Sequence, residues 1–103
     1  MSETASLEAR LREALHDVVD PELGIDIVEL GLVYRMAIDD GNVELDLGMT
    51  APSCPFGDEM ALDARRTLQL VPGVRRADVR IVLDPAWHPG LMSDEARRLL
   101  GWR

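Results

Sequence analysis

Apolar residues recur at helical spacing near the start of the chain. Four of them are separated by steps of four, four and three residues: Leu7, Leu11, Leu15 and Val18. This spacing places them on one face of an amphipathic helix over residues 5–18. An acidic turn is expected next, because Asp20 can cap a short turn that begins with Pro21 and Gly24 can end it.

Two segments then alternate between apolar and polar residues, as strands with one buried face do. The first covers residues 32–39 and the second residues 42–50, with the hairpin-turn pair Asp40-Gly41 between them. The alternation places four residues of the first strand on its buried face: Leu32, Tyr34, Met36 and Ile38. A third alternating segment, over residues 75–83, predicts one more strand.

Helical spacing returns over residues 58–70, and a last short helix is expected to begin after Ser93 and to end at Gly101. The order α-β-β-α-β-α predicts a single domain over residues 1–103. It predicts an α+β fold, a two-layer sandwich with the helices on one face of a small three-stranded sheet. The order of the strands stays open, because alternation shows which face is buried but not which strand is the neighbour.

Cys54 is the only cysteine, and it lies between the second strand and the helix over residues 58–70. Pro55 follows it, and proline is favoured at the first position of a helix, so we expect Cys54 at the N-cap. Backbone N–H groups and the helix dipole would there favour the thiolate. We therefore expect a reactive, partly exposed thiol; a buried structural cysteine is the alternative.

Acidic residues surround Cys54, either in sequence (Asp58 and Glu59) or, if the chain folds back, in space (Asp20 and Glu22). Anionic surroundings oppose a bare thiolate and attract a cation, which favours metal handling over peroxidase chemistry. A single cysteine excludes a thioredoxin-like pair. It also cannot supply the four thiolates that an iron–sulfur cluster commonly takes.

Composition limits the classes of partner and the cellular location that we expect. The formal net charge of −8 argues against nucleic acid or an anionic membrane as the main partner. No apolar run approaches membrane-spanning length, and the first residues lack the features of a signal peptide. Together with the single thiol, this indicates a reducing, cytoplasmic location.

Four ordered stretches carry a resemblance to a known family. They are DPELG at residues 20–24, IVELGLVY at residues 27–34, MTAPSCP at residues 49–55, and DPAW at residues 84–87 followed by Met92-Ser93. The chain resembles the small iron–sulfur cluster assembly domain catalogued as domain of unknown function fifty-nine, and within it the SufT-like members. The resemblance runs from about Leu7 to Gly101.

The resemblance implies an α+β sandwich and a role in maturing iron–sulfur proteins, as a carrier or targeting factor and not as an enzyme. The characteristic positions of the family correspond here to five residues: Asp20, Glu22, Leu23, Thr50 and Cys54. Thr50 would orient the Cys54 thiol or a bound sulfide, and Asp20 and Glu22 would contact iron or a partner's basic surface.

Two functional hypotheses follow. In the first, the protein transiently carries iron or an iron–sulfur cluster through Cys54, shared with a second copy or with a partner. In the second, it is a metal-free adaptor that docks the assembly machinery to client apoproteins. Both predict protein partners, namely the assembly machinery and its clients.

Overall fold

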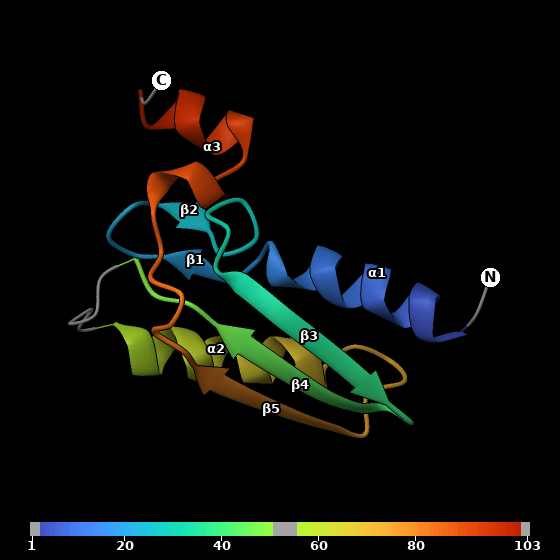
Figure 1. Cartoon of the computed structure of the whole chain (residues 1–103). Helices are drawn as coiled ribbons and strands as arrows, with labels where there is room; N and C mark the ends of the chain where they lie inside the picture. The colour runs from blue at the N-terminus through green and yellow to red at the C-terminus, as the bar shows by residue number, and fades with distance from the viewer. Residues whose placement is uncertain (1–2, 51–55, 102–103) are drawn as a thin grey trace.

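The computed structural model of the chain describes residues 3–50 and 56–101 (Figure 1). The elements, in chain order, are α1 (Glu3–Leu15), β1 (Val19–Asp20), β2 (Ile25–Asp26), β3 (Val33–Asp39), β4 (Asn42–Leu47), α2 (Gly57–Gln69), β5 (Arg76–Ile81), the 3-10 helix η1 (Pro89–Leu91) and α3 (Asp94–Leu99). Helices and a sheet built on a hairpin confirm the predicted α+β class. No helix in these described ranges is long and apolar enough to cross a membrane.

The main sheet has the strand order β3-β4-β5. β3 and β4 are antiparallel, and β5 runs parallel to β4 with Asn42 opposite Arg76. A parallel pair needs a crossover connection, which α2 provides. In the turn between β3 and β4, Asp40 has φ 49° and Gly41 has φ 82°, the pair of positive values that Asp-Gly favours in hairpins. The predicted hairpin is therefore confirmed.

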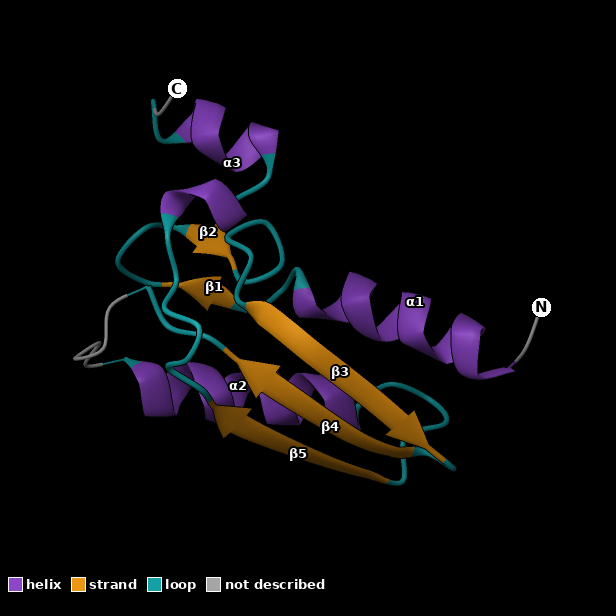
Figure 2. Ribbon diagram, in the orientation of Figure 1, coloured by secondary structure: helices purple, strands orange, loops and turns teal. Residues whose placement is uncertain are grey.

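The helices divide between two places. Figure 2 shows α2 behind the three-stranded sheet, where it packs along β5, while α1 contacts both α2 and β3. By contrast, α3 lies beyond the end of the sheet, next to β2 (Figure 1). The backbone N–H of Ser93 bonds to the carbonyl of Glu29 at 2.8 Å and anchors α3 to the turn after β2. The prediction that every helix covers one sheet face is therefore wrong for α3.

The predicted apolar face of α1 is buried. The helix itself ends at Leu15, not at residue 18, and Val18 reaches the core from the following turn. The largest fully buried apolar side chains come from α1 and the turn after it, from residues 27–32 before β3, from β4 and from α2. They are Leu11, Leu15, Val18, Ile27, Leu30, Leu32, Val43, Leu45, Leu47 and Leu68. This core fixes the ends of β1 and β4, between which the candidate site lies.

A β-bulge interrupts β3 at Tyr34. The pairing register with β4 shifts between Val33 and Arg35, so Tyr34 is the additional residue. Its ring lies over Gly48, where an added Cβ would come within 2.6 Å of Tyr34 Cζ. The strict alternation predicted for residues 32–38 therefore fails at Tyr34, because a bulge changes the phase of side chains along a strand.

Candidate functional site

The Asp20–Gly24 turn is closed by a two-stranded sheet. β1 and β2 pair antiparallel, with Val19 opposite Asp26 and Asp20 opposite Ile25. The Gly24 N–H bonds to the Asp20 carbonyl at 2.8 Å, and Gly24 has the positive φ of 71° that glycine permits. The predicted turn is confirmed. The two strands that close it could not be predicted, because two residues are too few to show an alternation.

Asp20 is a fully buried carboxylate. Its Oδ1 accepts the backbone N–H of Glu22 at 2.8 Å. A buried carboxylate is costly unless it accepts hydrogen bonds, so this contact ties the side chain to its own turn. The Asp20 carboxylate therefore points into the protein.

Thr50 meets Asp20 from the other side. Its Oγ1 donates to Asp20 Oδ2 across a long contact of 3.5 Å, between residues 30 positions apart. Thr50 is the last described residue before residues 51–55, and the chain leading to it is held by the Gly48 N–H, which bonds to the Leu32 carbonyl at 2.8 Å. The turn at Asp20 thus lies against the end of the β4 segment, where the stretch containing Cys54 begins.

Glu22 occupies a different environment. It is exposed on the outside of the turn, and only its backbone N–H contacts Asp20. Leu23, by contrast, packs partly buried against the core. The two predicted carboxylates therefore have opposite orientations: Asp20 faces inward and Glu22 faces solvent.

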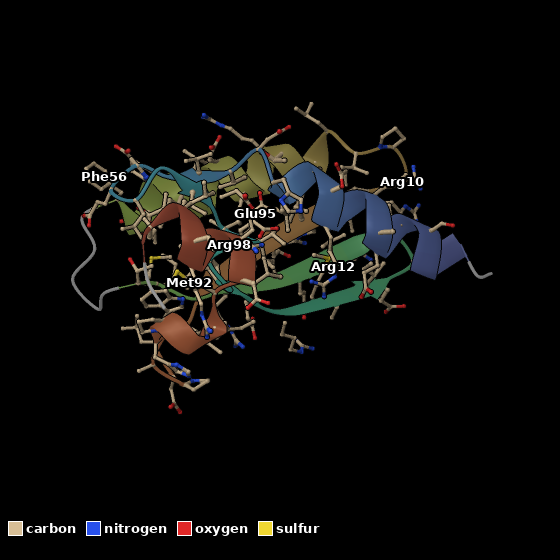
Figure 3. The ribbon with its side chains drawn as sticks, turned by 90° about the horizontal axis from the view of Figure 1, so that it is seen from above. Arg10, Arg12, Phe56, Met92, Glu95 and Arg98 are labelled. Atoms are coloured by element: carbon tan, nitrogen blue, oxygen red, sulfur yellow. The ribbon has the colours of Figure 1, made fainter. Side chains whose placement is uncertain are left out.

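The helix after Cys54 begins within one residue of the predicted start at residue 58, but its N-cap differs from the predicted one. α2 starts at Gly57, with Phe56 as its N-cap at φ −102° and ψ 7° (Figure 3). The prediction of an N-cap at Cys54 is therefore wrong. The first residue of α2 lies close to Met49, since an added Cβ at Gly57 would come within 3.1 Å of Met49 Sδ. Cys54 lies outside the described residues, so its exposure and its reactivity stay predictions.

The described residues contain no group of three or more histidine, cysteine, aspartate or glutamate side chains that could hold a metal ion. Both histidines have structural contacts. His16 Nδ1 pairs with Asp26 Oδ2 at 2.9 Å, and His88 Nδ1 accepts the Gly90 N–H at 3.1 Å as the N-cap of η1.

Asp26 organises a second part of this region, which sequence reasoning missed. Its Oδ2 accepts the backbone N–H groups of Val28 at 3.1 Å and Glu29 at 3.0 Å, besides the contact with His16. The spacing of two and three residues is typical of an aspartate that caps a turn, which was the only signal in the sequence. The carboxylate of Glu29 in turn accepts the hydroxyl of Ser93, the N-cap of α3.

Comparison with known proteins gives consistent results. Residues 8–81 match the family described as iron-sulfur cluster assembly protein. The Fe-S protein maturation auxiliary factor SufT of Staphylococcus aureus (strain USA300) is 41% identical over 85 residues, which cover 82% of this chain and 97% of that protein. The Fe-S protein maturation auxiliary factor YitW of Bacillus subtilis (strain 168) is 38% identical, over 93% of this chain and 95% of that protein.

Solved structures are similar over nearly the whole chain. A crystal structure of a domain of unknown function, DUF59, from Bacillus anthracis superposes with a TM-score of 0.90 and 38% identity, over 96% of this chain and 95% of that one. A conserved hypothetical protein from Thermotoga maritima gives a TM-score of 0.79 and 40% identity, over 91% and 93%. The fold and the sequence therefore point to the same group of proteins.

Proposed function

Since the chain belongs to the iron–sulfur cluster assembly protein family, we propose that it is an auxiliary factor in the maturation of iron–sulfur proteins. The two maturation auxiliary factors from Staphylococcus aureus and Bacillus subtilis support this role, because the chain covers 97% and 95% of their lengths. Carrying or targeting a cluster requires no catalytic turnover, so we place the protein among non-enzymatic factors. We place its action in the cytoplasm, where a lone thiol stays reduced.

We assign the transient binding of iron or a cluster to Cys54. The observation that carries this assignment is the 3.5 Å contact between Thr50 Oγ1 and Asp20 Oδ2, which ties the buried turn to the start of the Cys54 segment. In this proposal the Thr50 oxygen accepts the S–H of the Cys54 thiol while its own hydrogen goes to Asp20, and it turns that hydrogen to the sulfur when a sulfide is bound. Asp20 orients that hydroxyl, since its other oxygen is already engaged by the Glu22 N–H.

In this proposal Glu22 contacts the iron or the partner protein that arrives at the site. Its side chain is exposed on the same turn, so it can contact iron or a basic residue of a partner without the cost of moving a buried charge. The two carboxylates therefore have different roles in this proposal. Asp20 positions the Thr50 hydroxyl, and Glu22 contacts iron or the partner, whereas the second role was expected of both residues from the sequence.

The number of ligands makes any bound cluster labile. One chain supplies one thiolate, whereas clusters usually take four. A second copy, a small thiol or a client protein must complete the coordination. A site completed from outside exchanges its cargo readily, which suits a carrier.

A metal-free adaptor is the second candidate function. The observation that favours it is that Asp20, one of the predicted metal ligands, is fully buried and already accepts the Glu22 N–H. In this case the protein would bring assembly and client proteins together, with Cys54 playing no part in metal binding.

Anaerobic reconstitution with iron and sulfide separates the two functions. We expect the wild-type protein to retain iron in the presence of glutathione or a client apoprotein, and Cys54→Ser to lose it. Thr50→Val should retain less iron than wild type, and Glu44→Gln, a carboxylate change on exposed β4, should retain as much. Iron and sulfide per chain and the oligomeric state are the measurements.

A defined result contradicts the carrier hypothesis. If wild type holds no more metal than Cys54→Ser under every condition, including with a client present, the adaptor function replaces it. Cys54→Ser should change the free energy of unfolding by no more than about 0.5 kcal/mol if the thiol is exposed, since surface substitutions usually do no more. Urea unfolding of both proteins provides this control.

A further inference from the structure

Two open grooves meet at Val19, on the outer side of β1. The first, of about 320 Å³, runs from Val19 and Pro21 along the exposed side of α2 between Glu59 and Arg66. The second, of about 380 Å³, lies between β2, the end of α1 and α3. Because Val19 lines both, the grooves form one continuous surface, called here the Val19 surface.

Exposed apolar side chains from three elements line the Val19 surface. Val19 of β1 is 44% exposed, Leu62 of α2 is 46% exposed and Leu99 of α3 is 71% exposed. Scattered exposed leucines need no explanation, but apolar side chains gathered in a groove are typical of a binding site. Folding alone gives no reason for three separate elements to expose them in adjoining grooves.

The rim of the Val19 surface is acidic. Three exposed carboxylates line the two grooves: Glu59, Asp63 and Glu95. Asp26 and Glu29 also line them, but both carboxylates already accept hydrogen bonds within the chain. The cationic candidates there are Arg66 and His16, and His16 is already paired with Asp26. Figure 3 shows Glu95 on α3, which lines the same groove as His16 at the end of α1. Apolar side chains inside a negative rim select a partner with the opposite pattern.

We propose that the Val19 surface docks a partner protein through a segment whose apolar side chains are flanked by arginine or lysine. A second copy of this chain is a poor occupant, because a two-fold interface would place acidic rim against acidic rim. The proposal rests on the proposed function, in which a maturation factor must meet assembly or client proteins. The test of docking uses no metal, so the docking proposal and the proposed function can fail separately.

The position of this surface suits delivery. Val19 and Asp20 are consecutive residues of β1, and Val19 faces outward while Asp20 faces inward. A partner bound at Val19 therefore lies on the outer side of the turn whose inner side contacts Thr50. Docking would bring the partner beside the turn that contacts Thr50, the last described residue before the Cys54 segment.

The test uses a synthetic amphipathic helical peptide with leucines on one face and arginines on its flanks. Calorimetry gives its affinity, and amide shifts of the labelled protein locate it. We expect shifts at Val19, Leu62 and Leu99, and at least tenfold weaker binding to Leu62→Asp or Leu99→Asp. Leu70→Asp is the matched control, because Leu70 is 84% exposed but lines neither groove. Its affinity should equal that of wild type.

Charge is tested with a second peptide, in which glutamates replace the arginines. Asp63→Lys should weaken binding of the arginine peptide and strengthen binding of the glutamate peptide. Cys54→Ser should bind both as wild type does, whatever its iron content. Equal binding of the two peptides to wild type, shifts confined to the three-stranded sheet, or a wild-type dimer that Leu62→Asp converts to a monomer would each overturn the proposal.

Discussion

The hydroxyl of Tyr34 is buried and has no hydrogen-bond partner among the residues that the structure describes. Burial raises the pKa of Tyr34 above its usual value, because a buried phenolate loses its hydration. The β-bulge is the cause of this position, since it places the ring over Gly48. One additional residue in a strand thus determines how a side chain titrates.

Tyr34 is the only tyrosine in the chain, so its titration can be followed by phenolate absorbance. We expect a midpoint above pH 10 in the folded protein and near pH 10 in concentrated urea. A raised folded-state pKa contributes stability that is fully present below the unfolded pKa and is lost as pH rises through the folded pKa. Urea unfolding at a series of alkaline pH values should therefore show the free energy of unfolding falling above about pH 10.

Tyr34→Phe is the control for this titration. It should lack the decline that is specific to Tyr34 and should be no less stable at neutral pH, because it removes a hydroxyl that the described structure leaves unpaired. Identical midpoints in the folded and unfolded protein would show that the hydroxyl is solvated.

For individual residues, the sequence predicted some features of the candidate site and missed others. The family resemblance placed Asp20 and Thr50 in one site with Cys54, and that site stays a prediction; the structure shows that Thr50 contacts Asp20. Local pattern alone could not find this contact, because 30 residues separate them. The inward Asp20 and outward Glu22 were not predicted either, since the direction of a side chain in a turn depends on hydrogen bonds such as that from the Glu22 N–H. The roles of Cys54 stay predictions.

Among the elements, the attachment of the C-terminal segment depends on Gly31. A Cβ at Gly31 would lie 2.1 Å from the Leu91 carbonyl oxygen, so η1 can pack on this turn only because residue 31 is glycine. Nearby, Trp87 Nε1 donates to the Leu30 carbonyl at 2.7 Å. These contacts attach the segment that leads into α3 to the turn after β2.

Two glycines provide a matched test of this packing. Gly31 and Gly24 both have positive φ, 76° and 71°, but Gly24 has no atom within 4 Å of an added Cβ. Gly24→Ala should therefore cost only backbone strain, about 1–2 kcal/mol. Gly31→Ala should cost more, because the Leu91 backbone must also move.

Urea unfolding measures both costs. Amide hydrogen exchange should additionally show faster exchange in α3 for Gly31→Ala alone. Equal unfolding free energies for the two variants would mean that the close approach to Leu91 contributes nothing.

The long elements were predictable and the short ones were not. α1, β3, β4, α2 and β5 each span enough residues to show a period, and their predicted locations are confirmed. β1 and β2 span two residues each, below what alternation can reveal. α3 was predicted from its Ser93 cap, which accepts the Ala96 N–H at 3.0 Å, but its place beside β2 depends on tertiary contacts.

For the molecule as a whole, the α+β class followed from the order of helices and strands. The strand order and the parallel pairing of β4 with β5 did not, because a periodic pattern does not identify neighbours. Its negative charge predicted the absence of nucleic acid as a partner, and that expectation stays a prediction. The acidic rim of the Val19 surface shows where part of this charge gathers.

The parallel pairing of β4 with β5 also sets an order of events in folding. β3 and β4 meet across the Asp40-Gly41 turn through local contacts, whereas β5 must return past α2 and close a long loop. We therefore expect the hairpin to form first and β5 to join last, which pulsed hydrogen exchange would detect as later protection in β5. Simultaneous protection of all three strands would contradict this order. The stretch between Thr50 and Phe56 would then be anchored at both ends only in the last step, so a newly made chain could accept cargo only once it has folded.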